Sequence, residues 1–207
     1  MNYLVKRISN ATEIETCERF EISTFLWNSK QEPKTYGWLG YIEGTGLYAK
    51  FICEESDPRR VYTNDKDPVY KDSTVEVFLA FLKENEVLTN DCMYTNFEFN
   101  SNGALLASYG EGREGRPFLS DEHYALTNCK TAIYDNYWTA EVTIPEEFLY
   151  SICDFDAVKN GKTFYCNFYK ISETDEILHF GAFSPIDTPG PNFHVPVCFA
   201  EATIETK

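Results

Sequence analysis

Three polar side chains stand out because they lie in segments that otherwise have the pattern of buried β-strands. In STVEVFLAFL (73–82) apolar residues occupy both alternating faces, and Glu76 is the one carboxylate among them. A strand that is apolar on both faces is typical of the centre of a sheet. In MYTNFEFN (93–100), Glu98 and Asn100 share a polar face that lies opposite threonine and phenylalanine. Carboxylates and amides in such positions can hydrogen-bond the hydroxyl groups of a ligand.

Pairing of these two segments as a hairpin would place Glu76, Glu98 and Asn100 on a common outer face of the sheet. The three side chains would then form a polar floor flanked by aromatic residues. Such a floor suits polyhydroxylated ligands, because rings cover the C–H patches of a sugar while carboxylates and amides bind its hydroxyls.

Two strand carboxylates also meet one requirement of a glycoside hydrolase, whose acid and its nucleophile or base lie roughly 5–9.5 Å apart. Glu76 and Glu98 could supply this pair. Carboxylates beside sugars more often only accept hydrogen bonds, and the sequence has no GxSxG motif for a nucleophilic triad. We therefore expect binding without catalysis, and hydrolysis through Glu76 and Glu98 is the alternative.

Metal-binding patterns are weak in this sequence. None of the three histidines has HExxH spacing, so a catalytic zinc site is not expected. The acidic segment DPRRVYTNDKDPVYKDS contains oxygen donors suited to calcium, but without EF-hand spacing. These donors are Asp57, Asp65, Asp67 and Asp72. We expect no cofactor and no metal site, with calcium as an alternative that the spacing does not support.

The elements that must position these residues are seven strand-like segments separated by turn residues. They are Leu47–Glu54, Ser73–Leu82, Met93–Asn100, Gly103–Gly110, Tyr137–Pro145, Thr163–Ile171 and Cys198–Ile204. This pattern predicts an all-β fold, a two-sheet antiparallel β-sandwich that is jelly-roll-like and has little helix. A short helical turn is expected at 146–150. Without a linker or a repeat, residues 1–207 are predicted to form a single domain.

Composition limits the classes of partner. The chain has 207 residues, of which 16% are aromatic, and a formal net charge of −15. An acidic surface repels polyanions, so neither nucleic acid nor an anionic membrane is an expected partner. No apolar segment approaches the length of a membrane span, and none follows the first basic residues as in a signal peptide. The sequence as given therefore predicts a cytoplasmic protein, and it does not indicate an oligomeric state.

The cysteines do not form a recognisable framework. There are seven, an odd number, and none is part of a CxxC pair. This spacing argues against both a set of disulfides and a zinc ribbon. We expect reduced thiols that pack as small hydrophobic side chains.

Five sequence segments taken in order carry a family resemblance. They are VYKDSTVEVFLAF, YTNFEFN, YWTAEVTIP, NFYKI and FSPIDTPGPNFHVPVCFA. Together they resemble the family 9 carbohydrate-binding modules and their stand-alone relatives, over roughly residues 47–204. The resemblance implies a two-sheet sandwich that binds sugar chain ends in a slot between two aromatic rings. It also implies structural calcium in some members.

The resemblance also implies individual site residues. An aromatic residue six positions before a strand glutamate corresponds to Tyr70 before Glu76, and a second aromatic, in the loop before the last strand, corresponds to Phe193. Where the family has an arginine, followed two residues later by asparagine, this chain has Glu98 and Asn100. The implied sugar site therefore comprises these five residues. The reversed charge at Glu98 leaves open an interaction domain that no longer binds sugar.

Overall fold

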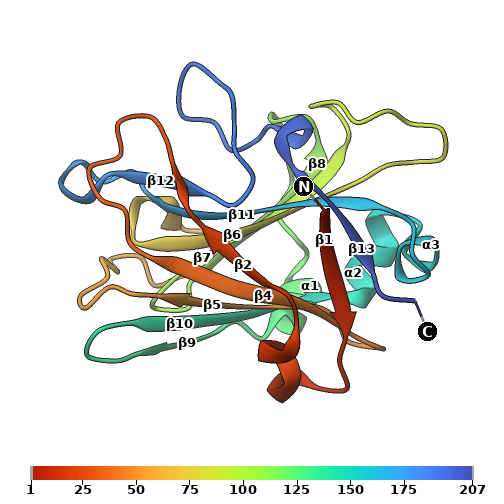
Figure 1. Cartoon of the computed structure of the whole chain (residues 1–207), viewed down its shortest axis with the longest axis horizontal. Coiled ribbons are helices and arrows are strands. Elements are labelled where there is room, and N and C mark those ends of the chain that lie inside the picture. The colour runs from red at the N-terminus through yellow and green to blue at the C-terminus, as the bar shows by residue number, and fades with distance from the viewer. Residues whose placement is uncertain (1, 207) are drawn as a thin grey trace.

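The computed structural model describes residues 2–206, and its strands form two facing layers (Figure 1). The first layer, sheet A, has the order β8-β7-β6-β11-β13, with β12 beside β11 and β3 beside β12. The bounds of its strands are β3 Thr24–Phe25, β6 Thr74–Phe81, β7 Met93–Asn100, β8 Leu105–Glu111, β11 Phe164–Ser172, β12 His179–Ala182 and β13 Ala200–Ile204. The second layer, sheet B, has the order β4-β5-β10-β9, with β2 on the side of β4 away from β5. Its strands are β2 Arg19–Ile22, β4 Thr35–Ile42, β5 Gly46–Cys53, β9 Lys130–Ile133 and β10 Trp138–Pro145.

One strand joins the two sheets. The first part of β1 (Asn2–Arg7) pairs in parallel with β13 of sheet A, and its last two residues pair in parallel with β4 of sheet B. Figure 1 shows β1 and β13 side by side. The predicted β-sandwich is confirmed, and these two parallel pairings are the departure from a wholly antiparallel arrangement.

The helices are short. The α-helices are α1 Asp121–Thr127, α2 Glu146–Ile152 and α3 Phe155–Lys159, and the 3-10 helices are η1 Ala11–Thr16, η2 Val69–Lys71, η3 Asp175–Ile177 and η4 Pro196–Cys198. The helical turn predicted at 146–150 is α2, with Pro145 as its N-cap. Within residues 2–206, no helix is long and apolar enough to cross a membrane.

All seven predicted strands exist, but six further strands were missed. The predicted ends agree with the observed ones within two residues, and β7 agrees at both ends. The missed strands are β1, β2, β3, β4, β9 and β12. Most are only two to six residues long, and the eight-residue β4, TYGWLGYI, has two glycines that interrupt its alternation. Gly37 is needed there because a Cβ atom would lie 2.1 Å from the carbonyl oxygen of Lys50.

The main core lies between the sheets. Val75, Val77, Leu79 and Phe81 of β6 all point into it and are at most 2% exposed. From sheet B, Phe51 and other apolar side chains of β4, β5 and β10 complete it. Burial of this apolar surface is the main stabilising contribution to the sandwich.

A second apolar cluster covers the outer face of sheet A. It includes Phe78 and Tyr169 from the strands, and Phe193 and Phe199 from the segment that follows β12. All eight residues of β6 are therefore buried, which confirms it as a central strand. The outer face of sheet A is closed except where polar side chains interrupt the cluster.

A buried lysine joins β11 to the neighbouring segments inside the sandwich. The Nζ of Lys170 donates to Ser73 Oγ (2.6 Å) and lies 3.1 Å from Glu55 Oε2 and 3.0 Å from His179 Nε2. Burial alone would raise the pKa of Glu55, but Lys170 and hydrogen bonds from Ser73 and Trp138 lower it to about 2. Burial and Lys170 lower the pKa of His179 to about 3. Glu55 is therefore ionised and His179 neutral at neutral pH.

We predict that Lys170→Met lowers the free energy of unfolding by roughly 3 kcal/mol, because it leaves the Glu55 carboxylate buried without its cation. Urea unfolding measures the change. Lys83→Met, at an exposed lysine that pairs with Glu111, is the matched control and should cost less than about 0.5 kcal/mol. Equal effects of the two substitutions would contradict the role assigned to Lys170.

All seven cysteines have free thiols in this structure. Burial raises the pKa of the thiols of Cys92, Cys129 and Cys153, so they stay protonated and weakly reactive. We predict seven titratable thiols per chain under denaturing, non-reducing conditions. A count of one thiol, which three disulfides would leave, would contradict this prediction.

Candidate functional site

A pocket of about 410 Å³ opens on the outer face of sheet A. We call it the outer pocket. Its floor is formed by β6, β7 and β8, and its walls by the segments around Trp27, Tyr70, Arg113, Glu173 and His194. The volume lies within the range of roughly 300–1,000 Å³ that is usual for small-molecule sites.

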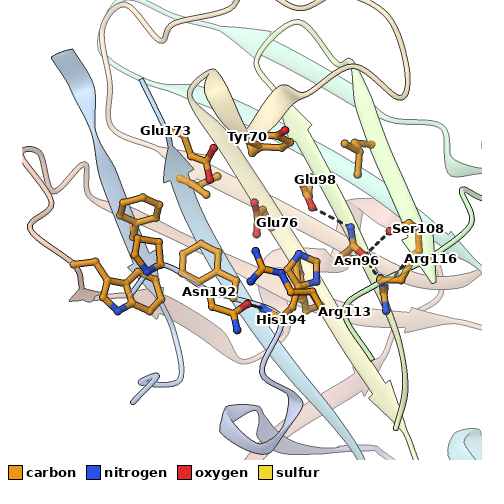
Figure 2. A pocket seen from close by; sticks show the side chains of 17 residues that line it. Tyr70, Glu76, Asn96, Glu98, Ser108, Arg113, Arg116, Glu173, Asn192 and His194 are labelled. Carbon is orange, nitrogen blue, oxygen red and sulfur yellow. Dashed lines mark hydrogen bonds between the residues drawn. The ribbon is translucent and has the colours of Figure 1, made fainter. Parts of the chain in front are cut away.

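Two glutamates form the centre of the floor. Glu76 of β6 is directly paired with Glu98 of β7, and their side chains are adjacent in Figure 2. They are only 2% and 5% exposed. Glu98 Oε1 accepts a hydrogen bond from Asn96 Nδ2 (2.9 Å), whereas the Oε2 atoms of both glutamates are buried with no hydrogen-bond partner among the described residues. Both glutamates line the pocket, and each has one buried carboxyl oxygen without a donor.

Burial dominates the electrostatics of this pair. It raises the pKa of Glu98 to about 8, and the hydrogen bond from Asn96 only partly offsets it. The pKa of Glu76 is also well above its usual range, because of burial and of the neighbouring Glu98 and Glu173. Like charges this close cannot both ionise readily, so the pair retains protons at neutral pH.

Arg116 is the cation nearest the floor, but other groups hold its guanidinium. It donates to Asn96 Oδ1 (2.7 Å) and to backbone carbonyls, among them those of Tyr94 and Gly110. Its guanidinium carbon also lies 3.5 Å from the centre of the Tyr94 ring. Asn96 Oδ1 accepts a second hydrogen bond from Ser108, so Asn96 links Arg116 to Glu98 (Figure 2).

The rim of the pocket carries further polar groups. Glu173 and Tyr70 lie at one edge in Figure 2, and Arg113, Asn192 and His194 lie at the opposite edge. Burial raises the pKa of Glu173, while Arg113 is among the groups that lower it. Burial and the neighbouring arginines lower the pKa of His194 to about 3, so this ring is neutral. Its Nδ1 is hydrogen-bonded to the hydroxyl of Tyr94 at 2.9 Å.

Aromatic side chains supply the apolar walls. Tyr70 is half-buried in η2, and Trp27 is half-buried in the turn after β3. Phe193 is only 6% exposed, because its ring stacks on Tyr169 with centroids 3.9 Å apart and packs against Trp27. One face of Phe193 is thus already covered, and Trp27 and Tyr70 offer more ring surface to a ligand.

Residues 9–204 match the sequence profile of carbohydrate-binding family 9. The chain belongs to this family. Membership of carbohydrate-binding family 9 covers nearly the whole chain and confirms the prediction, made from the sequence, of a carbohydrate-binding β-sandwich.

Solved structures share the family 9 fold. A protein from Bacteroides uniformis that is thought to bind carbohydrate is 23% identical, with a TM-score of 0.80 over 99% of both chains. A family 9 module from Caldicellulosiruptor kristjanssonii in complex with cellotriose is 12% identical, with a TM-score of 0.70 over 100% of this chain and 95% of that one. A glucose complex of a family 9 module from the same organism is 13% identical, with a TM-score of 0.65 over 100% and 97%. No curated protein matches the sequence.

Four of the five site residues predicted from the sequence line the outer pocket of this family 9 protein. These are Tyr70, Glu76, Glu98 and Phe193. Asn100 shares the outer face with Glu98, as predicted, but does not line the pocket. Its Nδ2 donates to Asp72 Oδ2 and to the carbonyl of Tyr62, both at 2.9 Å. Asn100 therefore holds the preceding loop in place and is fully buried.

Sequence reasoning missed several lining residues. Of these, Trp27 could have been identified as a candidate binding residue from the sequence, because it is a large aromatic side chain directly followed by the polar residues Asn-Ser-Lys. Glu173 and His194 carry no comparable local signal. Arg113 and Arg116 also line the pocket, and Arg116 donates a hydrogen bond to Asn96.

Three of the aspartates considered for calcium, Asp65, Asp67 and Asp72, accept hydrogen bonds from the protein's own donors. Asp72 Oδ2 accepts from the backbone amides of Val61 and Tyr62, and Asp65 Oδ1 accepts from that of Leu105. Across residues 2–206, no three His, Cys, Asp or Glu side chains are grouped so as to hold a metal ion. This donor set does not fit a calcium site.

We predict that Glu98→Gln stabilises the protein at alkaline pH. The pKa of Glu98 is about 8 in the folded chain, against an ordinary value of 4.5, so between these values the folded state binds a proton that the unfolded state has lost. The free energy of unfolding therefore falls as pH rises through this window. Glu98→Gln removes this loss and should raise the free energy of unfolding by roughly 1–3 kcal/mol at about pH 8, with little change at about pH 5.

Urea unfolding at the two pH values measures the effect. The exposed Glu84, in the loop between β6 and β7, supplies the matched control Glu84→Gln, which should change neither value. An equal effect of Glu98→Gln at both pH values would show that Glu98 does not carry the proton.

Proposed function

We propose that this family 9 protein binds a saccharide in the outer pocket, with a sugar ring against Trp27 and Tyr70 and its hydroxyls hydrogen-bonded to Glu76, Glu98 and neighbouring polar groups. The observation that carries the proposal is the combination of half-buried rings and unpartnered carboxyl oxygens around one cavity.

A pyranose has groups that are complementary to those lining this cavity. It presents a C–H patch that an aromatic ring can remove from water, and a rim of hydroxyls that can donate to the Oε2 atoms of Glu76 and Glu98. Each buried oxygen left without a donor costs free energy, so a ligand that supplies one gains affinity. Ser108 and Asn192 add further polar groups around the ring.

Binding without hydrolysis fits the two carboxyls better than glycosidase chemistry does. A glycosidase needs one protonated carboxyl and one ionised carboxylate on either side of the bond to be broken. Here burial raises the pKa of both Glu76 and Glu98, and the two lie at directly paired positions on one floor. Burial and the closeness of the two carboxyls therefore disfavour the ionised carboxylate that a nucleophile or base requires.

The remaining properties of the partner follow from charge. A net charge of −15 disfavours nucleic acid and anionic membranes as ligands. We further propose that the protein acts in a reducing compartment such as the cytoplasm, on the support of its seven free thiols.

We predict that Trp27→Ala and Tyr70→Ala each weaken binding of cellotriose by several-fold to about tenfold, because a stacked ring contributes on the order of 1 kcal/mol. Cellotriose and glucose are the first probes, since both are ligands of the family 9 modules from Caldicellulosiruptor kristjanssonii. Calorimetric titration measures the affinity, and thermal melting verifies that each variant is folded.

Tyr134→Ala is the matched control, because Tyr134 is 48% exposed and stacks on Tyr137 in the β9–β10 hairpin. Its affinity should equal that of the parent. If Trp27→Ala and Tyr70→Ala also bind as the parent does, the saccharide lies elsewhere. If no saccharide of a broad panel binds the parent, the alternative of an interaction domain without sugar binding replaces the proposal. If the parent hydrolyses aryl glycosides and Glu76→Gln does not, the alternative of a glycoside hydrolase is favoured.

A further inference from the structure

The floor of the outer pocket has two carboxyl oxygens without a hydrogen-bond partner among the described residues. They are Glu76 Oε2 and Glu98 Oε2, which belong to directly paired residues and are fully buried. A third carboxyl, that of Glu173, lines the same pocket. A neutral hydroxyl group can donate only one hydrogen bond to such an oxygen, and it brings no charge.

The cations around the pocket do not balance the central pair. Arg116 donates its hydrogen bonds to Asn96 Oδ1 and to carbonyl oxygens, and its charge only partly offsets the effect of burial on the pKa of Glu98. Lys71 and Arg113 lower the pKa of Glu173 at the rim of the pocket, against the effect of burial. Lys170 lies on the inner side of sheet A, where its Nζ is bound to Ser73 and close to Glu55 and His179, and its charge only partly offsets the rise in the pKa of Glu76.

Resting on the saccharide site proposed above, we propose that the preferred sugar carries a free amino group, and that its ammonium binds between Glu76 and Glu98. An ammonium offers three donors and no acceptor. Its positive charge also stabilises the ionised forms of the two carboxyls. The half-buried rings of Trp27 and Tyr70 select a ligand that also has an apolar ring face. The chemical class is therefore an amino sugar, and a simple polyamine does not fit.

Proton exchange follows from this arrangement. Burial keeps protons on the central pair at neutral pH, with the pKa of Glu98 at about 8. A bound ammonium stabilises the ionised forms, so binding releases protons to the solvent. Binding of a neutral sugar has no such driving force. The neighbouring His194 stays neutral, because burial and Arg116 lower its pKa to about 3, and it does not exchange protons near neutral pH.

The experiment compares matched saccharides by calorimetric titration at about 0.15 M salt, where non-specific attraction to the acidic surface is screened. The probes are cellotriose, the β-1,4-linked trisaccharide of glucosamine, its N-acetylated form, and spermidine as a polyamine without a sugar ring. We expect the glucosamine trisaccharide to bind about tenfold more tightly than cellotriose, since a charge-assisted hydrogen bond replaces a neutral one. Titrations at about pH 6, where the sugar amine is already protonated, in two buffers of different ionisation enthalpy should show proton release for the glucosamine trisaccharide alone.

Two variants locate the effect. Glu76→Gln and Glu98→Gln keep the shape of the floor but remove a carboxyl that can ionise beside the ammonium, and each should reduce the preference for the glucosamine trisaccharide to about twofold or less while cellotriose still binds. Glu84→Gln, on the exposed β6–β7 loop, should keep the full preference.

The outcomes separate this inference from the proposed function. If cellotriose binds at least as tightly as the glucosamine trisaccharide, the amino-sugar inference is wrong and the saccharide site stands. If spermidine binds as tightly as the glucosamine trisaccharide, or if the preference survives both glutamine variants, the inference is also wrong, because charge attraction away from the floor explains it. If none of the saccharides binds, the inference and the proposed function both fail.

Discussion

The register between β6 and β7 is the constraint on which the outer pocket depends. Side chains alternate between the two faces of a strand, so filling the core with Val75, Val77 and Leu79 forces Glu76 to the outer face. Antiparallel pairing then sets Glu98 directly beside it. A shift of β7 by one residue would turn Glu98 into the apolar core, where an unpaired carboxyl is very costly. The hydrophobic core thus determines where the acids of the pocket lie.

The sequence was sufficient for those parts of the structure that rest on regular alternation. It predicted β6 as a central strand, β7 with both of its ends, and the shared outer face of Glu76 and Glu98. The family resemblance added Tyr70 and Phe193, which lie in loops and have no periodicity of their own. Asn100 shows the limit of this reasoning, because periodicity gives the face of a side chain but not what covers it. The loop that contains Asp72 covers Asn100, and Asp72 accepts a hydrogen bond from the side-chain amide of Asn100.

The parts that could not be predicted depend on contacts between distant segments. Trp27 reaches the pocket because the two-residue β3 pairs with β12, and a pairing that short leaves no pattern in the sequence. Arg116 reaches it because the segment after β8 folds back, so that its guanidinium meets the carbonyl of Tyr94. The two parallel pairings of β1 likewise depend on a strand that crosses between the sheets. None of these contacts follows from the residues immediately around them.

Covering the outer face has two opposite consequences for the buried carboxyls. The apolar cluster around Phe78 and Phe193 removes Glu76 and Glu98 from water, which raises the pKa of both and destabilises the free protein at alkaline pH. The same low-polarity surroundings strengthen each hydrogen bond that a ligand makes to these oxygens. A ligand without a donor at the right place leaves them unpaired, and that penalty is larger than the gain from a well-placed neutral contact. Burial that is unfavourable for folding is therefore what allows this floor to discriminate between ligands.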